Sequence, residues 1–180
     1  MQRKRGFTLI ELLITIAIAA ILLGLAAPNL RDFIINNRRV TQTNDVLSDL
    51  AFARAEAAKS GRHVVICSTT TPGGATATCD GPVGDWAQGR LIWLDFNGDN
   101  ALNTADGDIR IRTSTNLEGS NRLVVNTVAG NNYVFYRSSG ISSTSGTFTI
   151  CDPNTSSNGR EITIAVTGRA SVTDTAANCP

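Results

Sequence analysis

The sequence predicts an α+β protein in which one long N-terminal helix packs on antiparallel β-sheets. Three observations lead to this fold class. Residues 7–27 are almost wholly apolar, residues 30–59 repeat apolar side chains at helical spacing, and residues 61–180 contain short runs rich in Val, Ile, Phe, Tyr and Thr between clusters of Gly, Asn, Ser and Pro. One helical segment followed by a series of strands indicates segregated α and β structure rather than alternating βαβ units.

The first segment, Phe7 to Ala27, has 21 residues and a single charge, Glu11. At about 1.5 Å of rise per residue, a helix of this length reaches roughly 31 Å, which matches the hydrocarbon core of a bilayer. Its twelve Phe, Leu and Ile side chains contribute about −6 kcal/mol to insertion, against about 3 kcal/mol lost by one carboxylate. We therefore expect a membrane-spanning helix in which Glu11 pairs with a cation from another chain, or with an amine created by processing.

Three basic residues, Arg3, Lys4 and Arg5, precede the apolar segment. By the positive-inside rule they place Met1 in the cytoplasm and the chain from Arg31 onward outside it, in a single-pass topology. The alternatives are a secretory signal peptide or a simple anchor. A signal peptide has an apolar core of only about 7 to 15 residues and is cut after small residues, and Gly24-Leu25-Ala26 makes a poor site of that kind.

The helical pattern resumes after Pro28 and predicts an amphipathic half of the same helix, bent or broken near Gly24 and Pro28. Ser60-Gly61 ends it, because glycine is the usual residue just past a helix. The predicted apolar face contains Phe33, Val40, Leu47, Leu50 and Ala51, and the polar residues between them include Arg38, Asn44, Asp45 and Asp49.

Seven or eight strands are predicted in the remainder of the chain. Their ranges are Arg62–Cys67, Arg90–Phe96, Asp108–Thr113, Arg122–Val128, Tyr133–Arg137, Thr147–Cys151, Glu161–Val166 and, as the eighth, Ala170–Thr173.

Four cysteines follow the membrane segment, on the side where disulfides persist. They allow three pairings, and we expect Cys67–Cys79, which closes a short loop, and Cys151–Cys179, which fastens the C-terminus to a strand. A zinc site is disfavoured because there is no C-x-x-C pair and His63 is the single histidine. His63 lies in a strand-like run and is expected to be structural.

The segment from Lys4 to Ile14, KRGFTLIELLI, resembles the class III signal of type IV pilins and pseudopilins. In that family a prepilin peptidase cuts between the positions of Gly6 and Phe7 and methylates the new amine. The resemblance implies a leader at 1–6, a transmembrane and polymerisation helix at 7–27, an amphipathic half at 28–60 and a periplasmic β-rich domain at 61–180. It also implies that Glu11 pairs with the Phe7 amine of a neighbouring subunit, and that Pro28 occupies a helix-kinking position.

Further positions resemble the FimT/GspH family of minor pilins and pseudopilins, which has the pilin fold. They are Arg54-Ala55-Glu56-Ala57, Ile66-Cys67, Trp86 to Asp95 with Gly89, Phe135 followed by Gly140, Thr147 to Cys151, and Gly168-Arg169. The family resemblance implies a protein of the bacterial inner membrane that enters a type IV pilus, in its initiation or tip complex, or a type II secretion pseudopilus. The implied partners are other major and minor pilins or pseudopilins, the prepilin peptidase and the inner-membrane assembly platform.

No enzymatic activity and no required cofactor are expected, because no nucleophile, dinucleotide or phosphate-binding motif is present. Calcium is the one ligand that a motif suggests. In the loop from Asp95 to Asp106, oxygen ligands stand at the spacing of an EF-hand loop, although Asn100 replaces the usual glycine and Asp106 the usual glutamate. The alternative is a polar turn. The potential ligands are Asp95, Asn97, Asp99, Asn103 and Asp106.

A DNA-binding surface is the second candidate site. Removal of the leader leaves 13 basic and 15 acidic residues, a net charge of −2, which alone does not favour a nucleic-acid binder. Some FimT-type minor pilins bind DNA through a C-terminal Gly-Arg-x-Arg motif, of which Gly168-Arg169 keeps the first half. We expect Arg160 and Arg169 to lie near each other across neighbouring strands, with Arg137 close by. A solvent-facing charge near a turn is the alternative reading.

Overall fold

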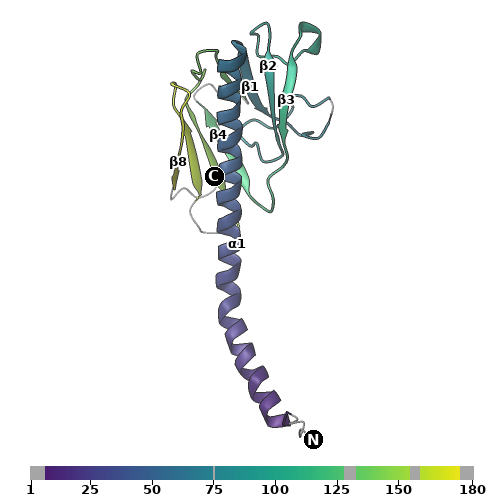
Figure 1. Ribbon diagram of the computed structural model, residues 1–180, viewed down its shortest axis with the longest axis vertical. Coiled ribbons are helices and arrows are strands. Elements are labelled where there is room, and N and C mark those ends of the chain that lie inside the picture. The colour runs from purple at the N-terminus through teal and green to yellow at the C-terminus, as the bar shows by residue number, and fades with distance from the viewer. Residues whose placement is uncertain (1–6, 75, 128–132, 155–158, 175–180) are drawn as a thin grey trace, which may run out of the picture. The chain divides into compact units, whose positions relative to one another are not determined.

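The structure is a computed structural model that describes residues 7–74, 76–127, 133–154 and 159–174, apart from the side chains of residues 26–29, 127 and 174. Helix α1 runs without interruption over Leu9–Ser60 (Figure 1). A break near Gly24 or Pro28 is therefore wrong, while a bend there stays a prediction. Gly61 ends the helix with a φ of 68°, and its N–H donates to the Ala57 carbonyl, as in the left-handed caps that glycine favours.

The chain divides into two compact units, residues 1–38 and residues 39–180. In the first unit, the large apolar side chains from Phe7 to Leu25 are between 52% and 86% exposed. A soluble protein rarely exposes a contiguous apolar surface of this size. Apolar surface of this extent is typical of segments that contact a membrane or other protein chains.

The second unit contains the strands, and every predicted strand is present with ends shifted by at most two residues. All neighbouring strands pair antiparallel. Among the described residues, sheet A has the order β3-β2-β1-β5 and sheet B the order β4-β6-β7-β8. The bounds are β1 His63–Ser68, β2 Arg90–Asp95, β3 Ile109–Ser114, β4 Arg122–Thr127, β5 Tyr133–Tyr136, β6 Gly146–Cys151, β7 Arg160–Ile164 and β8 Ala170–Asp174.

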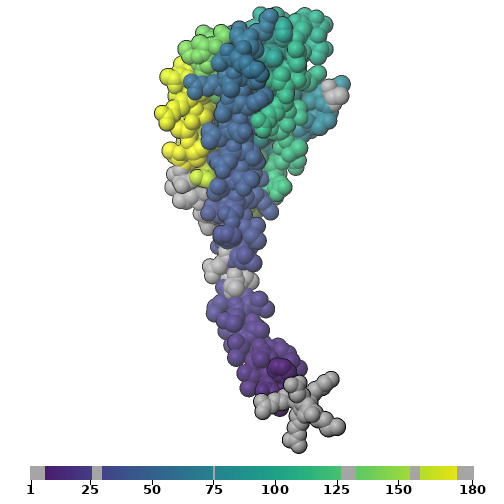
Figure 2. Space-filling model, viewed as in Figure 1, coloured from purple at the N-terminus to yellow at the C-terminus, as the bar shows by residue number. Residues whose placement is uncertain are grey.

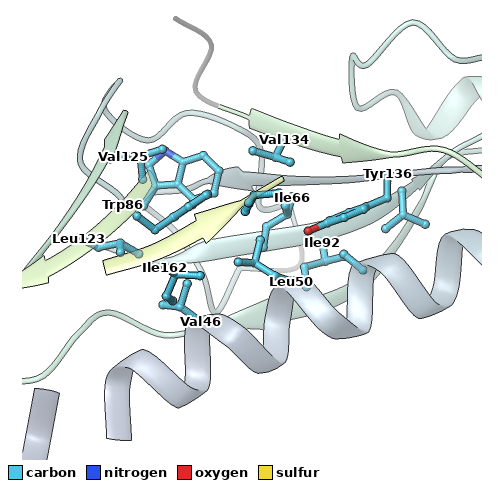
Figure 3. Packing of buried hydrophobic residues seen from close by; sticks show 14 of the residues in the cluster. Val46, Leu50, Ile66, Trp86, Ile92, Leu123, Val125, Val134, Tyr136 and Ile162 are labelled. Atoms are coloured by element: carbon cyan, nitrogen blue, oxygen red, sulfur yellow. The ribbon is translucent and has the colours of Figure 1, made fainter. Parts of the chain in front are cut away.

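The main core lies where the second half of α1 meets both sheets (Figure 3). Trp86 contributes the largest buried side chain and meets Phe148 edge to face, with ring centroids 5.1 Å apart. A smaller cluster around Val65, Leu91 and Trp93 packs separately from this core. In β1 the residues of the two clusters alternate, because successive side chains of a strand point to opposite faces.

The buried stripe of α1 differs from the predicted apolar face. Phe33 is 63% exposed and Ala51 is exposed, so these two predictions are wrong. The core is instead contacted by side chains at steps of three and four residues, namely Val46, Leu50, Ala53 and Ala57. The predicted amphipathic half at 28–60 is accordingly buried only from Arg39 onward.

Asp49 was placed on the polar face, yet its side chain is fully buried. One carboxylate oxygen lies 2.8 Å from Nε of buried Arg90, and the other lies 3.2 Å from Nε of Arg112. The pair joins α1 to β2 and β3. Hydropathy cannot reveal it, because a buried carboxylate is tolerated only where the fold supplies its cations.

Candidate functional site

The N-terminus of α1 is closed by a capping box between Thr8 and Glu11. The Thr8 N–H and hydroxyl donate to Glu11 Oε2 at 2.9 and 2.8 Å, and the Glu11 N–H donates to Thr8 Oγ1 at 3.3 Å. This reciprocal bonding satisfies helix N–H groups that have no carbonyl partner. Thr8 was missed by the sequence analysis, although a Thr three residues before a Glu at a helix start is the signature of this motif.

Glu11 lies in the most apolar part of α1. Over the described residues, α1 is the one helix long and apolar enough to cross a membrane, with a mean hydropathy of 2.7 in its most apolar window. The Thr8 N–H and hydroxyl donate to the Glu11 carboxylate, but among the described residues no Lys or Arg forms an ion pair with it. Gly6 lies outside the described residues, so cleavage between Gly6 and Phe7 stays a prediction.

The disulfide prediction is confirmed for Cys67–Cys79, whose Cα atoms are 5.6 Å apart. Cys151 is also disulfide-bonded, whereas Cys179 lies outside the described residues, and the pairing of these two stays a prediction. His63 stacks on Phe135 with ring centroids 5.2 Å apart, in keeping with its expected structural role.

In the loop from Asp95 to Asp106, side-chain oxygen atoms accept hydrogen bonds from other groups of the same loop. The Asp95 carboxylate accepts hydrogen bonds from the Gly98 N–H at 2.7 Å and from the Asn100 N–H at 2.9 Å. Asn100 adopts a φ of 60°, which asparagine tolerates better than most residues. The other predicted ligands bond within the loop in the same way: Asn97, Asp99, Asn103 and Asp106.

Within the described residues, no group of three or more His, Cys, Asp or Glu side chains is placed to hold a metal ion. The hydrogen bonds of the loop favour the polar-turn interpretation. Calcium binding stays a prediction that nothing in the geometry requires.

Arg54 of α1 connects two turns that are far apart in sequence. Its Nε donates to the Gly140 carbonyl at 3.0 Å, and its Nη2 donates to the Thr167 carbonyl at 3.2 Å. Gly168 has a φ of 81°, and a Cβ at this residue would lie 2.0 Å from the Gly140 oxygen. The two turns approach this closely only because Gly168 has no side chain. Three positions of the FimT/GspH resemblance, Arg54, Gly140 and Gly168, thus meet in space.

The arginines predicted to bind DNA are only partly together. Arg160 pairs with Asp174 and Ile164 with Ala170, so Arg160 and Arg169 stand at opposite ends of the β7–β8 hairpin. Four residues of strand separate these ends by roughly 13 Å. The prediction that Arg160 and Arg169 lie near each other is therefore wrong. Arg137 and Arg169, by contrast, belong to the two turns that Arg54 connects, and both are exposed.

A cavity of about 470 Å³ lies between α1 and these turns. Figure 2 shows that this half of α1 borders on the C-terminal strands, drawn in yellow, with its outer face uncovered. Burial raises the pKa of the nearby Tyr136 to about 12, an effect that the charge of Arg54 opposes. The cavity is lined by Leu47, Leu50, Ala51, Arg54, Ala55, Ala58, Ser139, Gly140, Gly168, Arg169 and Ala170.

Comparisons with known proteins agree with this architecture. The family model described as Type II transport protein GspH matches residues 42–168, and the model of the prokaryotic N-terminal methylation motif matches residues 1–27. No curated protein matches the chain.

Two crystal structures of the type IV minor pilin FimU from Pseudomonas aeruginosa PAO1 are similar in fold. The first, in space group P21, has a TM-score of 0.57 at 17% identity and covers 78% of this chain and 92% of FimU. The second, in P65, has a TM-score of 0.51 at 17% identity, with 72% and 88% covered. With the GspH model matching most of the chain and the methylation motif matching its start, the chain belongs to the GspH/FimT family of minor pilins and pseudopilins.

Proposed function

We propose that the chain is held in the bacterial inner membrane by residues 7–27 and is then incorporated into a type IV pilus, in its initiation or tip complex. The observation that supports this most is the exposure of every large apolar side chain from Phe7 to Leu25, interrupted by one capped acid. In a simple membrane anchor Glu11 would be unfavourable, because one carboxylate opposes insertion by about 3 kcal/mol. In a fibre the acid has a partner to bind.

Processing supplies that partner. In this proposal the prepilin peptidase cleaves after Gly6 and methylates the Phe7 amine, and the assembly platform then moves the subunit into the fibre. The basic residues Arg3, Lys4 and Arg5 keep the leader in the cytoplasm. The second unit, with its Cys67–Cys79 disulfide, folds in the oxidising periplasm.

The Glu11 carboxylate then pairs with the Phe7 amine of the next subunit. In an apolar fibre core such a pair orients the two helices, and removal of one member leaves a buried unpaired charge that costs about 3 to 5 kcal/mol. The Thr8 donors hold the carboxylate at the helix terminus, where it faces the end of the neighbouring helix.

Two measurements test the proposal. Mass analysis of the membrane-extracted chain should find methylated Phe7 at its N-terminus, whereas a chain that still begins with Met1 would contradict it. Glu11→Val should be cleaved normally but should largely disappear from the sheared fibre fraction. Thr15→Val is the matched control, since within the described part of the chain the Thr15 hydroxyl bonds only the Leu12 carbonyl of its own helix turn.

A type II secretion pseudopilus is the alternative assembly. The matching family model carries the name of a type II transport protein, while the similar crystal structures are of a type IV minor pilin. Deletion of the gene separates the two: loss of exoprotein release with normal twitching supports the secretion system, and the reverse supports the pilus.

DNA binding during natural transformation is a second candidate function, supported by the exposed Arg137 and Arg169 beside Arg54. Arg160 is too far away to add to it. Salt-sensitive retardation of duplex DNA by the protein, lost in Arg169→Ala, would support this function. Retardation that is unchanged in Arg169→Ala would contradict it.

A further inference from the structure

The outer edge of β8 carries backbone groups that have no partner in the described part of the chain. In sheet B, β8 is the last strand and pairs only with β7. At the turn between them the Ala165 N–H donates to the Arg169 carbonyl, and hydrogen-bonded pairs alternate with non-bonded pairs along an antiparallel ladder. The register of the hairpin therefore turns the N–H and C=O groups of Ala170 and Val172 away from β7.

The other three sheet edges are protected within the described residues. Beside β4, the Val125 N–H donates to the Gly84 carbonyl, and beside β5 the Ser143 N–H donates to the Phe135 carbonyl. Strand β3 carries two arginines and pairs with β2 in an irregular register. Covering segments, charged side chains and bulges keep sheet edges from pairing with other chains. Residues 170–173 of β8 carry no charge and no proline, and their register with β7 is regular.

The free edge of β8 borders the cavity of about 470 Å³ beside α1 (Figure 2). Ala170 lines it on the strand side, and three exposed small side chains, Ala51, Ala55 and Ala58, line it on the helix side. Ala170 and Val172 pack against the core that α1 shares with sheet B. Because side chains alternate along a strand, a segment added beside β8 places every second side chain against this apolar wall of α1.

Positive charge lies at the end of the edge where β8 begins. Arg169 directly precedes Ala170, and both Arg169 and Arg54 line the cavity. The Arg54 guanidinium donates to two turn carbonyls, and neither arginine forms an ion pair among the described residues. An added strand that runs antiparallel to β8, the more stable pairing per residue, ends beside these arginines. A carboxylate at its C-terminus then meets two cations.

We propose that the β8 edge binds the C-terminal segment of a different pilin subunit as an added antiparallel strand. Only a polypeptide can use a row of strand N–H and C=O groups, and main-chain bonds of this kind hold extended peptides on exposed sheet edges. In the complex, Ala170 and Val172 bond the segment, small apolar side chains contact α1, and Arg54 and Arg169 bind the terminal carboxylate. The proposal rests on the proposed function, because an initiation or tip complex brings unlike pilins side by side.

Photo-cross-linking of the full chain in cells tests the contact. The photoreactive residue p-benzoylphenylalanine is placed at Ser171, an exposed residue of β8, or, as the matched control, at Asn126, an exposed residue of β4. We expect position 171 to be joined to the last residues of another chain that has its own methylated N-terminal phenylalanine, and position 126 to give no such product. Absence of a product from position 171, or products only with this chain or with internal residues of another, would overturn the proposal.

Val172→Pro tests the main-chain bonds. Proline removes the outward N–H but no hydrogen bond to β7, and sheets tolerate proline at such edge positions, so the yield of the cross-link should fall at least about tenfold. Arg169→Gln leaves the backbone intact and should lower the yield as well. Arg137→Gln, an exposed arginine that does not line the cavity, is the control and should cross-link normally. Thermal unfolding verifies that each variant is folded. An unchanged yield in both Val172→Pro and Arg169→Gln would refute the proposal.

The terminal carboxylate is tested with a synthetic peptide that has the cross-linked C-terminal sequence and a fluorophore at its N-terminus. Fluorescence anisotropy measures its binding to the full chain in detergent. Amidation of the peptide's C-terminus should weaken binding at least about tenfold, because it removes the charge that Arg54 and Arg169 bind. Equal affinities of the acid and the amide would contradict the proposed orientation of the strand.

Duplex DNA is the rival ligand of the same arginines. Phosphates need no strand N–H, so DNA retardation that Arg169→Gln abolishes and Val172→Pro leaves unchanged, without the cross-link from position 171, would overturn the proposal in favour of DNA. The N-terminus of the chain is read in the same extract. An unprocessed Met1 would contradict the proposed function, whereas methylated Phe7 without the cross-link would contradict the strand contact alone.

Discussion

Gly168 is the residue whose missing side chain lets two turns meet over Arg54. We predict that Gly168→Ala lowers the free energy of unfolding by about 2 to 4 kcal/mol, because alanine is strained at positive φ and its Cβ would overlap the Gly140 oxygen. Gly73→Ala is the matched control. A Cβ there meets nothing within 4 Å, so its effect should stay within about 0.5 kcal/mol. Equal denaturation midpoints for the two variants would contradict the prediction.

Asp80 makes stability depend on pH. Hydrogen bonds from the hydroxyl and N–H of Thr70 hold its pKa below the usual 3.8. The folded chain therefore binds fewer protons than the unfolded chain as the pH falls through this range. The stabilisation is present above pH 3.8 and is lost as the pH falls through the lower pKa of the folded state.

We therefore predict that Asp80→Asn lowers stability at neutral pH and that its difference from the parent protein shrinks in acid. Denaturant unfolding at a series of pH values measures both. Asp45→Asn, an exposed carboxylate on α1, serves as the control. A difference between Asp80→Asn and the parent that stays constant from neutral pH into acid would show that the carboxylate is not involved.

At the scale of elements, the loop between β2 and β3, residues 95–108, is held by Asp95. Its side chain is 2% exposed and accepts two backbone N–H groups, so Asp95→Ala should destabilise the protein by about 2 to 4 kcal/mol. If the carboxylate only accepts the hydrogen bonds of the turn, the loss of stability should be the same in calcium and in chelator. Asp99→Ala, at an exposed position, should lower the stability less. A calcium-dependent rise in the melting temperature of the parent protein that Asp95→Ala abolishes would restore the calcium interpretation.

The strands were predictable because each is a short β-branched and aromatic run between turn residues, a local signal that tertiary context did not override. The buried stripe of α1 was not predictable in the same way, because it includes Asp49, a residue that a hydropathy scale assigns to the exposed face. Only the packing of α1 on β2 and β3 supplies Arg90 and Arg112 as partners.

Asp49→Ala should accordingly lower the free energy of unfolding by about 3 to 5 kcal/mol, since it leaves the buried Arg90 without its carboxylate.

At the scale of the whole molecule, the two functional regions differ in how far sequence could define them. Glu11 and the other residues of its motif are contiguous in sequence, so the N-terminal site can be predicted from the sequence alone. Arg54, Arg137 and Arg169, by contrast, come from α1 and from two turns that are distant in sequence, and which arginines meet there depends on hairpin register. This is why Arg54 was recognised only as a family position and why Arg160 was wrongly expected to lie near Arg169.

Thr8 and Glu11 have separable roles if assembly works as proposed. Thr8→Val removes one donor to Glu11 in the unassembled chain and should weaken the start of α1 by about 1 kcal/mol, lowering the amount of chain in the membrane. It leaves the carboxylate free to pair with a Phe7 amine, so the fraction of the remaining chain that enters fibres should be maintained. Glu11→Val should do the opposite, with normal membrane levels and little incorporation. Immunoblots of membranes and of sheared fibres measure both quantities. Thr8→Val losing incorporation as completely as Glu11→Val would mean that the hydroxyl, rather than the carboxylate alone, makes the contact between subunits.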